Sequence, residues 1–233
     1  PSAELQLTRG ESLADTARVL ERYVAAVVTR FASHRDVEEL AGHCSIPVIN
    51  GLSDLHHPCQ ALADVFTLHE KGKDLKKLKL AWVGDGNNVC NSLMITMAKF
   101  GGTMTVASPE GCEPPHPILT TVKAEAERSG AKIRVVHDPA VAVEGADVVY
   151  TDTFVSMGQE HERNTRLKVF LPRFQVTRKL LEKAHPNFVF MHCLPAHRGE
   201  EVEAEVIDGP RSIVWDQAAN RLHLQKSLLA SIV

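Results

Sequence analysis

Three separate segments of the 233-residue chain end in side chains that can do chemistry. Each polar string follows a short apolar run, and the strings are Gly84-Asp85-Gly86-Asn87-Asn88, Thr151-Asp152-Thr153 and His192-Cys193-Leu194-Pro195. In open parallel sheets, ligands bind beyond the carboxyl ends of the strands. Three polar strand ends that converge on one edge of a sheet therefore predict a site for a small polar ligand.

The glycine-rich string does not predict a nicotinamide cofactor. Gly84-x-Gly86 is like the start of a dinucleotide fingerprint, but Val89 occupies the third glycine position, and Ser108 stands where an acid that binds ribose is expected. The two asparagines that follow the glycines are more informative, because one asparagine suffices as a helix cap. We expect the amide of the other to bind a carboxylate with help from the helix dipole.

Asp152 and Ser156 form a pair that suits an ammonium group, because a carboxylate supplies charge and a hydroxyl supplies direction. The plainer interpretation is that Asp152 only caps the next element. The polar stretch from His161 to Arg166 follows, and its length is typical of a mobile lid.

Cys193 leaves three interpretations open. A buried, inert cysteine is the commonest case. The thiol follows a histidine at a strand end and precedes Leu-Pro, so it is also a candidate nucleophile or a polarisable contact beside the reacting group.

His56-His57-Pro58-Cys59-Gln60 is a second dense cluster. A metal pair is disfavoured, because adjacent histidines point in different directions and no further ligand stands at zinc-like spacing. Pro58 suits the first turn of a helix, which places His57 at the helix start and Gln60 within the first turn. The cluster therefore predicts either an anion or carbonyl site or a simple helix start.

An alternation of helices and strands must position these groups. The expected helices are 13–30, 36–43, 59–70, 89–100, 119–129, 139–144, 176–184 and 222–233, and the expected strands are 80–83, 103–107, 132–136, 148–150 and 188–191. The alternation from Leu80 onward predicts a parallel α/β sheet with right-handed connections. We expect Arg30 to end the first helix, after a cap at Ser12, and Arg221 to open the last, where both would ordinarily be solvated charges.

Composition excludes several classes of protein. The net charge of −3 gives no electrostatic basis for binding nucleic acid or an anionic membrane, and no window has the roughly 18 apolar residues of a membrane span. The five cysteines are scattered and lack a CxxC pair, which indicates reduced thiols in a reducing compartment. No targeting signal is visible at the start of the sequence, so we expect a cytoplasmic protein.

The polar strings, taken together, resemble those of the aspartate/ornithine transcarbamylase family, and of its ornithine branch in particular. The strings that carry the resemblance are Glu11–Arg18, His57–Gln60, Trp82–Asn88, Asp152–Gly158 and His192–Pro195, which occur in the family's order over the whole chain. The resemblance implies two doubly wound parallel-sheet domains of the α/β class. A carbamoyl-phosphate domain would comprise residues 1–70 and the C-terminal helix 220–233, and an ornithine-binding domain would comprise residues 80–210.

The resemblance also implies a reaction and a set of site residues. The carbamoyl group of carbamoyl phosphate would pass to the δ-amino group of L-ornithine, giving L-citrulline and phosphate, in arginine metabolism. The residues implied for carbamoyl phosphate are Arg30, His57, Gln60, Cys193, Leu194, Arg221 and Gln6, the last reaching into a neighbouring subunit's site. Those implied for ornithine are Asn88, Asp152, Ser156 and Met157. Cys193, Arg30 and His57 are the implied catalytic residues, with no metal or organic cofactor, in a homotrimer or an assembly of trimers.

Two further expectations concern the chemistry. We expect Cys193 to handle a proton or orient the substrate, and not to form a covalent intermediate. The family's Ser-Thr-Arg-Thr phosphate motif is not found in the 233 residues, so the first domain is expected to be incomplete and carbamoyl phosphate to be weakly held if these residues are the whole protein.

Three alternatives stay open on the sequence alone. A transcarbamylase for another amine, such as putrescine or aspartate, has a related site, although an aspartate site would need cationic residues near Ser156. A non-catalytic domain that binds ornithine would keep the amino-acid pocket without the phosphate motif. A cysteine-dependent hydrolase is supported only by His192-Cys193.

Overall fold

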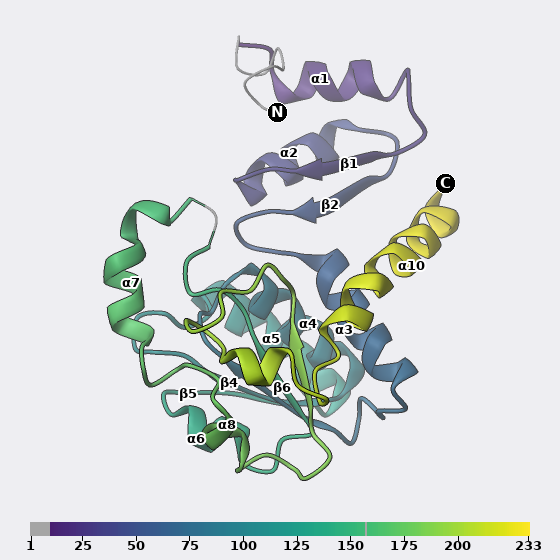
Figure 1. Ribbon diagram of the computed structural model, residues 1–233. Helices are drawn as coiled ribbons and strands as arrows, with labels where there is room; N and C mark the ends of the chain where they lie inside the picture. Colours follow the sequence, from purple (N-terminus) through teal and green to yellow (C-terminus); the bar gives the residue numbers. More distant parts are fainter. Residues whose placement is uncertain (1–9, 157) are drawn as a thin grey trace.

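The computed structural model describes residues 10–156 and 158–233, which form two parallel β-sheets joined by helices (Figure 1). The smaller sheet pairs β1 (Val27–Arg30) with β2 (Val48–Leu52). The larger sheet has the strand order β5-β4-β3-β6-β7. Its strands are β3 (Lys79–Val83), β4 (Thr103–Ala107), β5 (Lys132–Val136), β6 (Val148–Thr151) and β7 (Val189–His192). The α/β class predicted from the sequence is therefore confirmed.

The order of the larger sheet creates a binding position. The chain starts in the middle at β3, winds outward through β4 and β5, and returns to place β6 and β7 on the other side. The strand order thus reverses between β3 and β6, and the carboxyl ends of strands at such a reversal form a crevice. The three polar strings follow β3, β6 and β7, so the fold brings them to one edge of the sheet.

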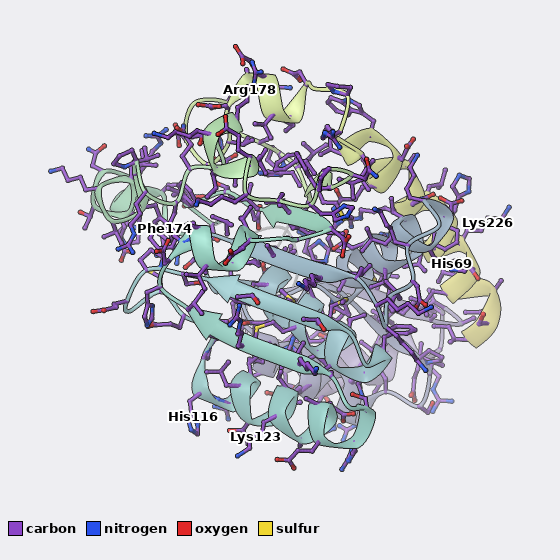
Figure 2. The ribbon with its side chains drawn as sticks, turned by 90° about the horizontal axis from the view of Figure 1, so that it is seen from below. His69, His116, Lys123, Phe174, Arg178 and Lys226 are labelled. Carbon is purple, nitrogen blue, oxygen red and sulfur yellow. The ribbon has the colours of Figure 1, made fainter. Side chains whose placement is uncertain are left out.

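Helices cover both faces of the larger sheet and bury two apolar cores. One core joins Trp82, Tyr150 and Met104 to α3 (Pro58–Glu70), α4 (Asn88–Phe100) and α5 (His116–Ser129). The other core joins the opposite faces of the strands to α6 (Pro139–Val143), α7 (Arg163–Phe170), α8 (Arg178–Leu181) and α9 (Ala204–Ile207). Figure 2 shows the sheet between α5, which carries His116 and Lys123, and the short helix that carries Arg178. Burial on both faces explains the continuous apolar runs of these strands.

The first unit corrects one prediction of local structure. α1 spans only Leu13–Leu20, with the Ser12 hydroxyl accepting from the Asp15 N–H as predicted, whereas the helix was expected to continue to Arg30. Residues 27–30 instead form β1, because the β-branched run Val27-Val28-Thr29 favours a strand once β2 supplies its hydrogen bonds. α2 (His34–His43) then leads to β2. Arg30 consequently ends a strand and not a helix.

Other boundaries also move. α10 spans Val214–Ile232, so Arg221 lies inside this helix and does not open it. The predicted helix 176–184 is reduced to α8, because Val176 forms a parallel bridge with Val202. The polar stretch expected as a lid is helical, since Glu160–Glu162 is a 3-10 turn that continues into α7.

Across residues 10–156 and 158–233, none of the helices combines the length and the apolar character that crossing a bilayer demands.

Candidate active site

A cavity of about 740 Å³ lies where the two sheets meet, within the range typical of small-molecule sites. It collects nine of the residues predicted from the sequence, which are Arg30, His57, Gln60, Asn88, Asp152, Ser156, Cys193, Leu194 and Arg221. Gln6 and Met157 lie outside the described residues. The two units therefore share one cavity, to which α3 and α10 contribute from one side and the ends of β6 and β7 from the other.

Two arginines line one part of the cavity. Arg30 reaches it from the end of β1, at a register shift in the pairing with β2. Arg221 reaches it from α10, and its Nη1 donates a hydrogen bond of 2.9 Å to Gln60 Oε1. Arg30 is an exposed side chain at a strand end and Arg221 is a half-buried side chain inside a helix, so neither is the helix-terminal charge that the sequence allowed. Two guanidinium groups on one wall suit an anion such as a phosphate.

His57 is a buried side chain close enough to both arginines to feel their charges. It caps α3 with Pro58 in the first turn, as predicted, and its backbone N–H donates to Ser92 Oγ at 2.7 Å. Burial, together with the charges of Arg221 and Arg30, lowers the pKa of His57 to about 3. Its Nδ1 is buried and has no hydrogen-bond partner among the described residues. The structure favours the neutral imidazole, which has one N–H to donate.

The two asparagines divide their roles, but differently from expectation. Asn87 Oδ1 caps α4 by accepting from the N–H groups of Val89 and Cys90, and its Nδ2 donates to Asp152 Oδ2 at 2.7 Å. Asn88 was expected to have a free amide, yet its Nδ2 donates to the Ser53 carbonyl at 2.6 Å. A primary amide has two N–H groups, so Asn88 can still offer one to a ligand.

The Gly84-Asp85-Gly86 turn must contain glycine for a packing reason. A Cβ on Gly86 would stand 2.2 Å from the Pro114 nitrogen, which the backbone cannot accommodate. Asp85 is mostly buried and pairs with Arg166 on α7 at 2.6 Å. Burial raises the pKa of Asp85, and the Arg166 charge opposes that rise. The segment expected as a mobile lid is thus attached to the strand end beneath it.

Asp152 and Cys193 form the opposite wall. The carboxylate accepts hydrogen bonds from Asn87 and from the Thr153 N–H, and its oxygen, a His192 nitrogen and the Cys193 sulfur all lie within 4.8 Å of one another. Burial raises the pKa of the Cys193 thiol well above its ordinary value, and the neighbouring Asp152 carboxylate raises it further. A thiol that stays protonated is a poor nucleophile. The raised pKa therefore argues against a nucleophilic Cys193, and its orienting role stays a prediction.

The loop after β7 is held by the residues around it. Leu194 has a φ of 58°, which is unusual for a residue other than glycine. Its N–H donates to His192 Nδ1 at 2.9 Å, while the N–H of His192 donates to Gln217 Oε1 at 3.0 Å. Such strained conformations occur at binding sites where the surroundings enforce them.

Sequence reasoning missed a group of buried polar residues behind the cavity. Asp64 on α3, Tyr150 on β6 and Gln217 on α10 are fully buried and bonded to one another. The available signal was an acid in the apolar stretch Ala61–Leu68, since an unpaired aspartate is rarely buried. The sequence did not show what would pair with it.

A cavity between two parallel α/β units, with arginines on one wall and a carboxylate and a thiol on the other, suits a transferase that brings an anionic donor and an amine together. Residues 1–70 match the family described as aspartate/ornithine carbamoyltransferase, carbamoyl-P binding domain, and residues 76–232 match its Asp/Orn binding domain. The chain therefore belongs to the aspartate/ornithine carbamoyltransferase family.

Individual relatives agree in sequence and in structure. The anabolic ornithine carbamoyltransferase of Pyrococcus furiosus is 55% identical over 99% of this chain and 73% of its own length. The ornithine carbamoyltransferase of Methanothermobacter thermautotrophicus is 57% identical over 98% of this chain and 75% of its own length. The solved structure of the Pyrococcus furiosus enzyme superposes with a TM-score of 0.94 at 55% identity, covering 100% of this chain and 74% of that one.

Proposed function

We propose that the cavity transfers the carbamoyl group of carbamoyl phosphate to the δ-amino group of L-ornithine, giving L-citrulline and phosphate. The observation that carries this proposal is the pair of walls in one cavity, with Arg30 and Arg221 on one and Asp152 and Cys193 on the other. The relatives named ornithine carbamoyltransferase at 55–57% identity support the same reaction.

The arginine wall takes carbamoyl phosphate. Arg30 and Arg221 hold the phosphate and stabilise the negative charge that develops as phosphate leaves. His57 is neutral, so its contribution is one hydrogen bond to the carbamoyl group and not a positive charge. Gln60 holds Arg221 through its Oε1, which aims the guanidinium into the cavity. Leu194 lies beside the carbamoyl group in this assignment.

The opposite wall takes ornithine. Asp152 and Ser156 hold the α-ammonium group, and Asn88 together with the backbone of Met157 holds the α-carboxylate. Asp152 is already fixed by Asn87, so its carboxylate is oriented before the substrate arrives. In this assignment the δ-nitrogen lies near Cys193 and the carbamoyl carbon.

The reaction needs a neutral δ-amine, since only the neutral nitrogen carries a lone pair. A lysine-like amine has a pKa of about 10.4 in water, so the ammonium form must lose a proton on entering the cavity. The nitrogen then attacks the carbamoyl carbon, the bond from that carbon to the phosphate oxygen breaks, and the proton that the attacking nitrogen sheds ends on the departing phosphate. Cys193 stays a protonated thiol during this step and orients the nitrogen. No atom of the thiol joins the carbamoyl group.

The proposal includes the organisation of the protein. Residues 1–70 with the helix 220–233 act as the carbamoyl-phosphate domain, and residues 80–210 act as the ornithine domain. The protein acts as a homotrimer in the cytoplasm, and Gln6 contributes to a neighbouring subunit's site.

The test is a comparison of three acceptors. The protein is incubated with carbamoyl phosphate and ornithine, putrescine or aspartate, and the carbamoylated product and phosphate are both quantified. Citrulline formation from ornithine at a kcat/KM at least tenfold above that for putrescine is expected. A preference for putrescine would assign the site to another amine. Ornithine binding in a calorimeter without any turnover would identify a non-catalytic ornithine-binding domain instead.

A further inference from the structure

A buried hydrogen-bonded group lies behind the arginine wall. The Asp64 carboxylate accepts from Gln60 Nε2 at 2.8 Å and from Gln217 Nε2 at 2.7 Å, both at Oδ1, and its Oδ2 lies 3.0 Å from the Tyr150 hydroxyl. Asp64 is fully buried, as are Gln217 and Tyr150. We call Asp64, Tyr150 and Gln217 the Asp64 group.

Two glutamine amides connect Asp64 to the parts of the chain around the cavity, and one of them, that of Gln60, lines the cavity itself. Gln60 uses its nitrogen to hold Asp64 and its oxygen to accept from Arg221. Gln217 uses its nitrogen for Asp64 and its oxygen to accept from the N–H of His192, which precedes Cys193. Each amide therefore has its nitrogen on Asp64, while the oxygen of Gln60 accepts from Arg221 on the wall of the cavity and the oxygen of Gln217 accepts from the main chain of β7.

The orientation of both amides depends on Asp64. A glutamine amide can be turned by 180°, which exchanges its oxygen and nitrogen. A carboxylate oxygen accepts only, so it forces the nitrogens of Gln60 and Gln217 toward itself and their oxygens toward Arg221 and His192. Turned the other way, Gln60 would present an N–H to the Arg221 guanidinium, which has no acceptor.

We propose that Asp64 is a positioning residue, which fixes the amide of Gln60 so that Gln60 holds Arg221 in place for carbamoyl phosphate. This inference rests on the proposed function, since it names what aligns one wall of that site. Asp64 itself touches neither substrate.

The protonation state of Asp64 is compatible with this role. Burial raises the pKa of Asp64 to about 7, against the opposing hydrogen bonds from Gln60, Gln217 and Tyr150. A neutral acid can keep Oδ1 as the acceptor for both amides and donate from Oδ2 to the Tyr150 oxygen. Asparagine has the same shape and can make the same set of bonds, with its Nδ2 in place of the Oδ2–H.

The test compares Asp64→Ala with Asp64→Asn in steady-state kinetics. Losing a buried hydrogen-bond anchor for a charged group is expected to raise the KM for carbamoyl phosphate in Asp64→Ala by about ten- to a hundredfold. The KM for ornithine is expected to change by less than about threefold, and Asp64→Asn is expected to restore most of the lost affinity. If Asp64→Ala does not fold, Asp64→Thr takes its place. The threonine hydroxyl oxygen lies one bond closer to the main chain than the aspartate carboxylate oxygens do.

A matched control comes from the next turn of α3. Thr67 also joins α3 to α10, through a hydrogen bond of 3.0 Å from Asn220 Nδ2 to its Oγ1, but it has no bond to Gln60 or Arg221. Thr67→Val should lower the unfolding temperature without changing the KM for carbamoyl phosphate. Equal KM changes in Asp64→Ala and Thr67→Val would overturn the proposal, because both would then act through helix packing.

A double-mutant cycle tests the route through Gln60. In a Gln60→Ala background, Asp64→Ala should add little to the KM for carbamoyl phosphate, because the amide that it positions is gone. Fully additive effects would contradict the proposal.

Calorimetric titration with inorganic phosphate gives a readout without turnover. Failure of the native protein to form citrulline would count against the proposed function alone, while a phosphate affinity unchanged in Asp64→Ala would count against the role of Asp64.

Discussion

Arg221 Nη1 donates a 2.9 Å hydrogen bond to Gln60 Oε1, although 161 positions separate the two residues in sequence. The bond joins α10 to the first turn of α3 at the wall of the cavity. It explains how a residue from the middle of the last helix becomes part of a site that begins at His57.

Arg221→Lys should weaken carbamoyl phosphate binding strongly. Lysine keeps the charge but lacks the planar fork that can hold Gln60 and an anion together. Removing one positioned donor from a developing charge typically costs about 100-fold in kcat, so we expect kcat/KM for carbamoyl phosphate to fall by at least this factor. Steady-state kinetics with carbamoyl phosphate as the varied substrate measures this fall in kcat/KM. Arg211, which stacks on Phe188 away from the cavity, is the control position, and Arg211→Lys should leave kcat/KM unchanged.

Asp152→Asn should affect ornithine and spare carbamoyl phosphate. The amide keeps the shape of the carboxylate but loses the charge that attracts an ammonium group. A charge-assisted hydrogen bond of this kind corresponds to about ten- to a hundredfold in affinity, so the KM for ornithine should rise by that amount. Isothermal titration with each substrate separates the two effects. A rise confined to carbamoyl phosphate would mean that the two substrates occupy the opposite walls from those assigned.

Cys193→Ser should keep a measurable activity, because the thiol orients the nitrogen and forms no bond to carbon. We expect a loss of about tenfold, the size of one hydrogen bond. Because the thiol pKa is raised by burial and by Asp152, alkylation of Cys193 by iodoacetamide at pH 7 should be slower than that of a free cysteine. Mass spectrometry follows both the alkylation and quenched single turnovers. Recovery of a carbamoylated Cys193 would refute this role.

His57 should make the folded chain less stable as the pH falls. Its pKa is about 3 in the folded chain and near 6.5 in the unfolded chain, so between these values the unfolded chain binds the extra proton. Above about pH 6.5, His57 is neutral in both states and does not lower the free energy of unfolding. As the pH drops from 6.5 toward 3, protonation of His57 in the unfolded chain lowers the free energy of unfolding. His57→Gln should flatten that part of the curve, as measured by urea unfolding at several pH values. An unchanged slope would show that His57 is charged in the folded chain.

The sequence predicted more of the fold than of the contacts within the site. The alternation from Leu80 onward correctly predicted a parallel sheet, because strands buried on both faces are continuous apolar runs and their ends are marked by Gly84 and Asp152. The predicted place of Pro58 in the first turn of α3 was also correct. These features depend on neighbours in the chain, which the sequence contains.

Tertiary structure alone decided the rest. Residues 27–30 fit a helical period, and only pairing with β2 made them a strand that ends at Arg30. The partners of Asp64 come from α3, β6 and α10, so its burial and its hydrogen bonds depend on contacts between distant segments. The neutral state of His57 has the same origin, because burial and the charges of Arg30 and Arg221 act on it only after folding. By itself, the sequence determined which groups stand at the strand ends, because that order is local. The contacts that align and tune them required the folded chain, because hydrogen bonding and desolvation depend on distance in space.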